Sequence, residues 1–201
     1  MKEKITKFAI GHADVSRETL ETYVSLLLKW NQKINLIGPS TESEIWERHI
    51  NDSLQLVPLI PKTATSIVDI GSGAGLPGLV VASQVSTPIT LIERDQRKCA
   101  FLAEAIRICG LNHVTLLNSD ASNSQEKYAV IMSRALASIK KILVIADGMI
   151  MENSICLFPK GKTYANELIE AQRHWDFNYQ LTPSLTQNEA VILTISNLKI
   201  K

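Results

Sequence analysis

VDIGSGAGLPG, residues 68–78, joins a short run of β-branched residues to a cluster of glycines. The apolar run over 66–70 is short and stops abruptly at Gly71, which predicts a buried strand. Glycines directly after a strand let the backbone adopt positive φ and approach a ligand closely. Glu93 ends the next apolar run, 22 residues after Gly71, the spacing at which a carboxylate meets ribose hydroxyls in a βαβ nucleotide site. These features predict a nucleotide-type ligand at the end of the first strand.

The glycine spacing fits two classes of cofactor. A dinucleotide would use Gly73, Gly75 and Gly78 as Gly-x-Gly-x-x-Gly, but this frame begins three residues beyond the strand. A methyl donor would use Gly71, Gly73 and Gly75, with the Asp69 carboxylate facing a cationic sulfonium. We therefore favour S-adenosylmethionine, and keep as alternatives a dinucleotide and a glycine-rich turn that binds nothing.

Further short apolar runs predict the rest of a sheet. They cover residues 88–93, 113–118, 128–132, 154–158 and 190–196. Helix-length segments separate several of them, and the clearest, 95–109, begins with Asp95 and stops before Gly110. Strands alternating with helices indicate an α/β fold: a Rossmann-like, mainly parallel sheet with helices on both faces. Between the last two runs we see no helical pattern, only polar residues near 182–188, so we expect an antiparallel C-terminal hairpin to close the sheet.

The N-terminal third is predicted to be helical. After Ser16, apolar residues recur at three- and four-residue steps as far as Ile34, on one face of a helix. Thr41 and Glu44 form a capping-box pattern for a second helix, which would end before residue 58. The strongest boundary is 58–65, so we expect a helical extension, 1–62, packed on a domain, 63–201, as one compact unit.

Composition and charge exclude several classes of protein. The chain has 201 residues, 45% of them apolar, enough for one domain with a sizeable core. Lys and Arg number 21 against 20 Asp and Glu, so any nucleic-acid site must be a local patch. Three separated cysteines fit neither a disulfide framework nor a Cys-x-x-Cys metal site. Since the segment after Met1 does not resemble a leader and no apolar run reaches about 18 residues, we expect a cytoplasmic protein with no metal and no membrane attachment.

Several segments together resemble one protein family. Residues 68–78 resemble motif I of class I methyltransferases, and the whole chain resembles the bacterial ribosomal small-subunit methyltransferase G family, also called glucose-inhibited division protein B. The other matching segments, in chain order, are Trp30-Asn31, Asn35-Leu36, Arg48-His49-Ile50-Asn51-Asp52-Ser53-Leu54, Arg97-Lys98-Cys99-Ala100-Phe101-Leu102, Ser133-Arg134-Ala135 and Lys160-Gly161. This set is far more specific than a glycine motif alone.

The resemblance implies a reaction and its site residues. The family transfers a methyl group from S-adenosylmethionine to N7 of one guanine, rRNA position 527, in 16S ribosomal RNA. The cofactor-binding residues would be Asp69, Gly71, Gly73, Gly75, Leu76, Glu93, Asp120, Ala121, Ser122 and Arg134. Arg134 would also be the catalytic residue, because it follows the fourth predicted strand and can grip a phosphate or guanine O6. Arg48, His49 and Lys160 would contact the RNA.

The chain departs from the family pattern at two places. Residues 118–122 read NSDAS where the family often has Arg and Glu, and Asn51 replaces an apolar residue. The reaction itself asks little of the protein's acids and bases, because guanine N7 carries a lone pair and no proton. Alignment of the two reactants is therefore the main requirement.

We expect the partner to be 16S ribosomal RNA, in a 30S subunit or an assembly intermediate, and the enzyme to be a monomer. Two other functions fit the same fold. One is an NAD-dependent oxidoreductase that uses the shifted glycine frame. The other is a non-catalytic ribosome-assembly factor that binds RNA, since a fold alone does not prove an activity.

Overall fold

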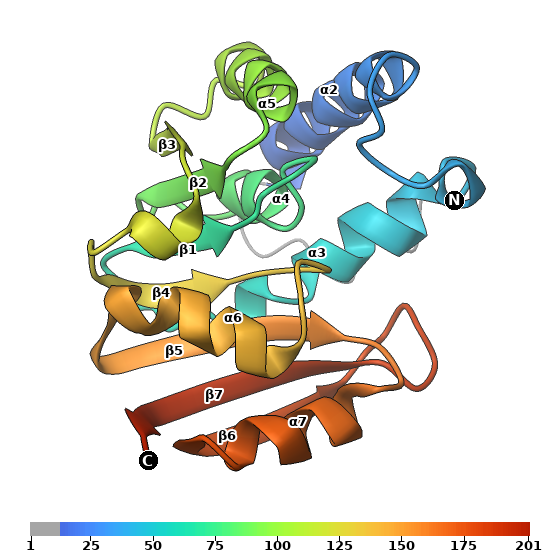
Figure 1. Ribbon diagram of the computed structural model, residues 1–201. Helices are drawn as coiled ribbons and strands as arrows, with labels where there is room; N and C mark the ends of the chain where they lie inside the picture. Colours follow the sequence, from blue (N-terminus) through green and yellow to red (C-terminus); the bar gives the residue numbers. More distant parts are fainter. Residues whose placement is uncertain (1–12) are drawn as a thin grey trace.

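Seven strands form one sheet in the order β3-β2-β1-β4-β5-β7-β6 (Figure 1). The computed structural model describes residues 13–201, so the segment that follows Met1 lies outside it. The strands are β1 (Ile67–Ile70), β2 (Ile89–Glu93), β3 (Val114–Asn118), β4 (Tyr128–Met132), β5 (Ile150–Lys160), β6 (Trp175–Pro183) and β7 (Val191–Ile200). Neighbours among the first five strands are parallel, and β7 lies antiparallel between β5 and β6. The prediction of a mainly parallel sheet with an antiparallel C-terminal hairpin is confirmed.

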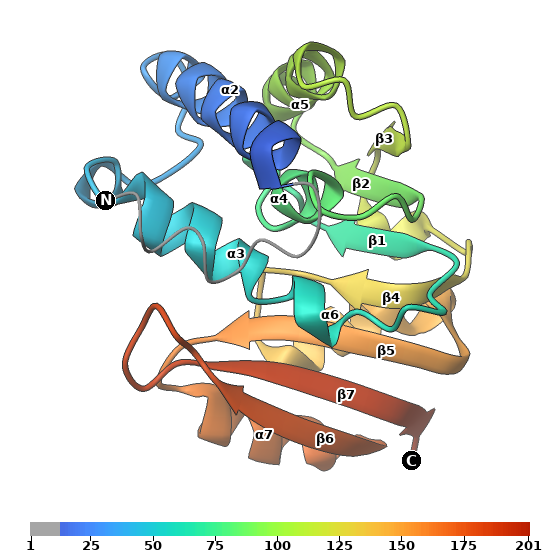
Figure 2. The same ribbon diagram turned by 180° about the vertical axis from the view of Figure 1, so that it is seen from behind.

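Helices cover both faces of the sheet. The main α-helices are α2 (Ala13–Asn31), α4 (Gly78–Ala82), α5 (Gln96–Ile108), α6 (Ile139–Ala146) and α7 (Tyr164–Gln172). The short turns are η1 (Pro39–Thr41), the π-helical η2 (Trp46–Asn51), α3 (Asp52–Leu54), η3 (Val57–Leu59), η4 (Ala121–Asn123) and η5 (Asp147–Met149). In Figure 1 α6 and α7 lie in front of the sheet, and Figure 2 shows α2, α3 and α4 on the opposite face.

The two faces follow from the alternation of side chains along the strands. Ile67 of β1 joins one buried cluster, with residues of α2, α4 and α5, whereas Val68 and Ile70 join the other, with residues of α6 and α7. Because both faces are covered, β1 is buried along its whole length. The carboxyl ends of the parallel strands all reach one edge, where ligands bind in open α/β sheets.

Local signals set the bounds of α5 as predicted. The Asp95 side chain accepts hydrogen bonds from the backbone amides of Arg97 and Lys98, which caps the helix. Gly110, just beyond the helix, has φ +65°, a left-handed conformation that glycine adopts without a steric cost.

The prediction that no helix separates the last two strand runs is wrong. Helix α7 and strand β6 both lie between β5 and β7, and the hairpin is formed by β6 and β7. Strand β6 was missed because its outer half is exposed and polar at the edge of the sheet, so it lacks an apolar run. Of the polar stretch near 182–188, the first two residues end β6, and the rest lie in the hairpin loop, which spans 184–190.

The N-terminal segment is helical, with different bounds. Helix α2 ends at Asn31, before Ile34, and the Thr41 hydroxyl bonds the Gly38 carbonyl instead of capping a helix. The chain then enters η2, whose first residue has no side-chain cap. Apolar residues of α2 and η2 belong to the same buried cluster as β1, α4 and α5. Residues 1–12 of the expected extension lie outside the described range.

Candidate active site

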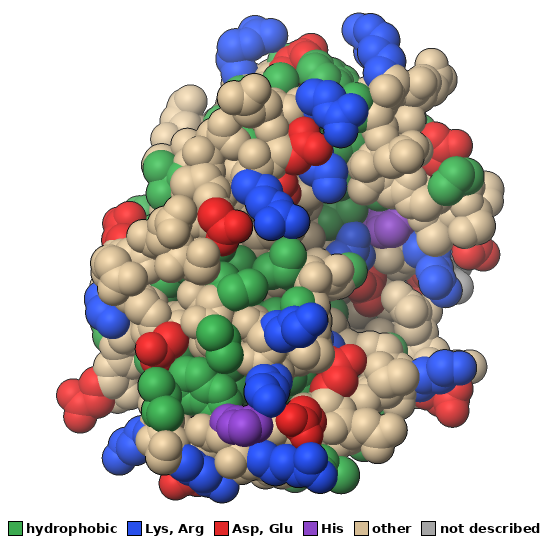
Figure 3. Space-filling view, in the orientation of Figure 1, with side chains coloured by type: hydrophobic (Ala, Val, Ile, Leu, Met, Phe, Trp, Pro, Cys, Tyr) green, Lys and Arg blue, Asp and Glu red, His purple; other side chains and the backbone are tan. Residues whose placement is uncertain are grey.

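Two neighbouring cavities open at the carboxyl ends of the parallel strands. The larger, of about 780 Å³, lies over β1, β2 and the residues after β3. The smaller, of about 440 Å³, lies between η2, the end of β5 and the β6–β7 loop. His49 and the segment 134–137 line both, so the two cavities share a wall. In Figure 3 this side of the molecule is hollowed, with basic, acidic and histidine side chains gathered around the hollow.

The glycine turn after β1 forms the floor of the larger cavity. Gly71, Gly73 and Gly75 all have positive φ, between +57° and +80°, and the first two line the cavity. A Cβ at Gly73 would meet only one atom within 4 Å, the Gly71 carbonyl oxygen at 3.7 Å, so the backbone there faces open space. This open backbone would allow the close approach to a ligand that the sequence predicts.

Glu93 fixes this turn and also lines the cavity. Its carboxylate accepts hydrogen bonds from the backbone amides of Gly73, at 2.8 Å, and Asp95, at 2.9 Å. A carboxylate has about four acceptor sites, so Glu93 keeps capacity for the hydroxyls of a ribose. Its position at the end of β2, beside the glycine turn, matches the spacing argument.

Asp69 does not face the cavity. It is fully buried and is absent from the lining residues. One carboxylate oxygen accepts from the Gly78 amide at 3.1 Å, and the other has no partner. Burial, only partly offset by the hydrogen bond from the Gly78 amide, raises the pKa of Asp69 to about 7. The expectation that this carboxylate faces a sulfonium is therefore not met, and Asp69 instead links β1 to the start of α4.

The residues after β3 are split between the cavity and the surface. Asp120 and Ala121 line the larger cavity, as does Leu76, whereas Gly75 and Ser122 do not. The Asp120 side chain accepts from the Ser122 amide at 3.0 Å and the Ser122 hydroxyl at 2.8 Å, which caps η4. These hydrogen bonds hold the pKa of Asp120 below its ordinary value.

Arg134 lies in the wall between the cavities. It follows β4, and its side chain is only 15% exposed. One terminal nitrogen, Nη1, donates to the Arg48 carbonyl at 3.3 Å and to Asp52 Oδ2 at 3.2 Å. The other, Nη2, donates to His49 Nδ1 at 3.0 Å. The structure thus brings Arg134, Arg48 and His49 together, although 85 residues separate His49 from Arg134 in the sequence.

The hydrogen bonds of His49 define its tautomer. Arginine can only donate, so Nδ1 accepts, and Nε2 carries the proton that it donates to the Thr41 hydroxyl at 2.7 Å. Burial and the charge of Arg134 lower the pKa of His49 to about 4, against a smaller opposite effect of Asp52. His49 is therefore neutral near pH 7 and both of its ring nitrogens are engaged.

Lys160 lines the smaller cavity, with its amine tied to the protein. Its Nζ donates to the Ala137 carbonyl at 2.7 Å and pairs with Glu167 Oε2 at 3.0 Å. The same Glu167 oxygen accepts from the Ile139 amide. Lys160 thus ties the segment after Arg134 to α6 and α7.

Sequence reasoning missed two groups of cavity residues. Leu36 and Ile37 line the larger cavity, on a turn held by the Asn31 side chain, which accepts from both of their amides at 2.9 Å. Ser184 and Gln187 of the β6–β7 loop line the smaller one. The Asn31 segment was noted only for its resemblance, and nothing in the sequence shows that a loop 50 residues after Arg134 returns to the site.

Comparisons with known proteins match this chain to a family of rRNA methyltransferases. The family described as GidB: rRNA small subunit methyltransferase G matches residues 16–193. The chain belongs to this family. A protein of Gluconobacter oxydans (strain 621H) named ribosomal RNA small subunit methyltransferase G is 43% identical over 188 residues, covering 92% of this chain and 97% of that one. A protein of the same name from Paramagnetospirillum magneticum is 42% identical over 183 residues, covering 89% of each chain.

Solved structures show the same fold at low sequence identity. One is M. jannaschii TYW2 in complex with AdoMet, which superposes with a TM-score of 0.57 at 13% identity and covers 76% of each chain. Family and fold together indicate that this chain depends on S-adenosylmethionine. The Rossmann-like class I fold expected from the sequence is confirmed.

The larger cavity fits this cofactor. Its volume of about 780 Å³ suits a ligand of nucleoside size, and it combines the open glycine turn with the Glu93 carboxylate. Apolar side chains of Ile92 and Ala121 also line it, as an adenine ring requires. Within residues 13–201, no cluster of three or more His, Cys, Asp or Glu could hold a metal ion, and no helix is long and apolar enough to span a bilayer.

Proposed function

We propose that this chain methylates N7 of a single guanine, rRNA position 527, in the 16S ribosomal RNA of the small subunit. Family membership supports an rRNA methyltransferase. The main structural support for an active site here is that a cofactor-sized cavity and a second cavity share a wall that contains Arg134. A base that enters the second cavity would lie next to the cofactor.

The larger cavity holds the cofactor in this proposal. Gly71, Gly73 and Leu76 shape its floor, Glu93 binds the ribose hydroxyls, and Asp120 with Ala121 adjoins the adenine. When bound, S-adenosylmethionine would supply a methyl group carried on a sulfonium, and the methyl carbon would pass to the N7 lone pair while the carbon–sulfur electron pair stays with S-adenosylhomocysteine. Gly75, Ser122 and Asp69 support the turns from outside the cavity.

Arg134, which also lines the larger cavity, is the proposed catalytic residue, and in this proposal its contact with the cofactor adds little to cofactor affinity. A guanidinium has five N–H donors, and three contacts to Arg48, Asp52 and His49 leave donors free. The remaining N–H groups can bind guanine O6, which lies beside N7 on the same edge of the base. Proximity and this orientation supply the catalysis. No general base is needed, because N7 carries no proton. His49 is neutral, and both of its ring nitrogens already form hydrogen bonds.

Arg48, His49 and Lys160 complete the acceptor side. All three line the smaller cavity, and Lys160 acts there by holding the backbone at Ala137. At the mouth of the larger cavity, Arg94, Lys98 and Lys141 supply positive charge toward RNA phosphates. The enzyme would act as a monomer in the cytoplasm, on a 30S subunit or its assembly intermediate.

A methyl-transfer assay tests the proposal. The protein is incubated with S-adenosylmethionine labelled on the methyl group and with 30S subunits from a strain that lacks it, and labelled guanines are mapped by N7-specific chain cleavage. We expect label at one 16S guanine. Tight binding of cofactor and RNA without transfer would instead support the non-catalytic assembly factor, and label at another atom or RNA would contradict the assigned target.

A further inference from the structure

Asp52 forms hydrogen bonds with two segments that are distant in the sequence, and with the nearby Gln55, at the smaller cavity. Its carboxylate is buried, with 9% of the side chain exposed. Oδ2 accepts from Arg134 Nη1 at 3.2 Å, and Oδ1 accepts from the Thr186 hydroxyl at 2.8 Å and from Gln55 Nε2 at 3.3 Å. The partners lie after β4, in the β6–β7 loop and directly after α3.

Gln55, next to Asp52 in the site, also holds the β6–β7 loop. Gln55 accepts from the Leu185 amide at 2.6 Å, and its Nε2 contacts the Thr186 and Ser184 hydroxyls at 3.2 and 3.4 Å. Ser184 lines the cavity from the side of this loop, and Asp52 lines it as well. The buried Asp52 carboxylate therefore contacts both the Arg134 guanidinium and, through Thr186 and Gln55, the loop that forms the opposite wall.

Arg134 needs such support. It stands on a segment without regular structure between β4 and α6, and the next residue, Ala135, has φ +55°. An arginine side chain has many rotamers, so it contributes to a transition state only if its surroundings hold it beforehand. Asp52 is a carboxylate opposite the guanidinium, and His49 and the Arg48 carbonyl add neutral acceptors.

We propose that Asp52 is a positioning residue for methyl transfer, which aims Arg134 at the acceptor base and, through Thr186, makes the β6–β7 loop a part of the acceptor site. This inference rests on the role of Arg134 in the proposed function. Asp52 acts through Arg134 and the loop, and the cofactor cavity does not include it.

A double-mutant cycle on the full-length chain tests the coupling. Asp52→Asn keeps the shape of the side chain but turns a charged acceptor into an amide. We expect its single-turnover transfer rate to 30S subunits, at saturating S-adenosylmethionine, to fall at least about tenfold. Cofactor affinity should change less than about twofold, because Asp52 does not line the larger cavity. Glu170→Gln, at a surface ion-pair group on α7, is the matched control and should retain the full rate.

The decisive comparison is made in the Arg134→Ala background. If Asp52 acts through Arg134, adding Asp52→Asn should lower the rate no further than about twofold. Rate losses that multiply, or a loss of cofactor affinity in step with the rate, would overturn the proposal in favour of a general stabilising role. An Arg134→Ala variant with full activity would contradict the proposed function of Arg134 itself, which is a different result.

Thr186→Val tests the contact between Asp52 and the β6–β7 loop if the Asp52→Asn protein does not fold. Valine has the shape of threonine and lacks only the hydroxyl that donates to Asp52. We expect a rate loss of about three- to tenfold in the otherwise unchanged chain and none in the Arg134→Ala background. An unchanged rate for Thr186→Val would exclude the loop from the acceptor site.

Discussion

At the scale of single residues, Asp69 shows that a motif residue can act without touching the ligand. It stands directly before the glycine turn, where a carboxylate is expected to face the cofactor, yet it is fully buried. Its only hydrogen-bonded carboxylate oxygen accepts from the amide of Gly78, at the start of α4. The turn is therefore held in place by a buried acid, which makes its stability depend on pH.

Asp69 should make the protein less stable as the pH rises from about 4 to 7. Its pKa is near 3.8 when unfolded and about 7 when folded, so between these values only the folded state binds the proton. The stabilisation is complete below the unfolded pKa and is lost as pH rises through the folded one. Denaturant unfolding of the wild type and Asp69→Asn across this range should show a pH-dependent difference of up to about 4 kcal/mol. Parallel curves for the two proteins would contradict the raised pKa.

Substitutions at two glycines with similar φ angles can distinguish the cost of backbone strain from the loss of a cofactor contact. Gly73 and Gly110 have φ of +57° and +65°, and neither position would place a Cβ in collision with a neighbour. Alanine should cost about 1 kcal/mol of stability at either site. Only Gly73→Ala should weaken S-adenosylmethionine binding, because only Gly73 lines the larger cavity. Calorimetric titration of both variants checks this, and equal affinities would remove Gly73 from the cofactor site.

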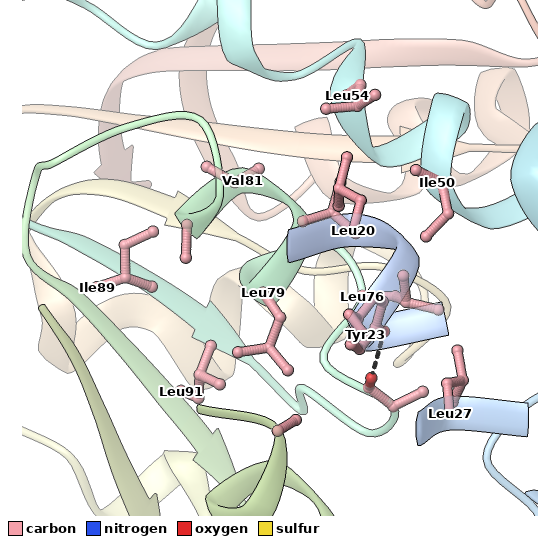
Figure 4. Packing of buried hydrophobic residues seen from close by; sticks show 14 of the residues in the cluster. Leu20, Tyr23, Leu27, Ile50, Leu54, Leu76, Leu79, Val81, Ile89 and Leu91 are labelled. Carbon is pink, nitrogen blue, oxygen red and sulfur yellow. Dashed lines mark hydrogen bonds between the residues drawn. The ribbon is translucent and has the colours of Figure 1, made fainter. Parts of the chain in front are cut away.

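At the scale of elements, helix α2 reaches the cofactor turn directly. Figure 4 shows the hydroxyl of Tyr23 bonded to the backbone of this turn, at the Ala74 carbonyl 2.6 Å away. Tyr23 is fully buried, and burial raises the pKa of its hydroxyl, so it donates at any ordinary pH. Ala74 lines the larger cavity. The N-terminal helix is therefore a structural support of the cofactor site.

Tyr23→Phe should affect both stability and cofactor binding. The buried Ala74 carbonyl would lose its donor, at a cost of about 1–3 kcal/mol. We expect a lower melting temperature and an affinity for S-adenosylmethionine reduced about three- to tenfold, since the turn is no longer held. Tyr179→Phe, on the exposed edge strand β6, is the control and should change neither. A destabilised Tyr23→Phe protein with unchanged affinity for S-adenosylmethionine would show that Tyr23 stabilises the core and does not support the cofactor site.

Elements with strong local signals were predictable from the sequence, and those defined by distant contacts were not. The run before Gly71 and the cap at Asp95 have local causes, and both were located within one or two residues. Strand β6 is an exposed edge, and the η2 turn begins without a side-chain cap, so their patterns are weak. The wall around Arg134 depends on contacts across more than 80 residues, which no local pattern encodes.

At the scale of the whole molecule, we propose that the described part of the extension, residues 13–62, and residues 63–201 fold as one unit. Leu20, Leu27 and Ile50 are buried in one cluster with Leu79 and Leu91 of the α/β part (Figure 4). Removing the extension would expose to water the apolar residues of the α/β part that pack against α2 and η2. Burial of apolar surface is the main term that favours folding, so this exposure would be destabilising.

A fragment of residues 63–201 should therefore not fold alone. We expect it to aggregate, or to show helical circular dichroism without a cooperative melting transition. Adding residues 1–62 as a separate chain provides a control, since recovered cooperative unfolding would show that the missing contacts are the cause. A fragment that melts cooperatively on its own and binds S-adenosylmethionine would show that the extension is a separate, dispensable domain.

The most direct test of the whole account is one comparison on Arg134→Ala, because this residue joins the two cavities. The single-turnover rate of methyl transfer to 30S subunits and the dissociation constant of S-adenosylmethionine are measured on the same preparation, with Arg134→Lys alongside. The account predicts a rate at least about 100-fold below wild type with cofactor affinity within about threefold, and only partial recovery by lysine, which lacks the planar fork. A wild-type rate, or a rate loss explained entirely by lost cofactor binding, would contradict it.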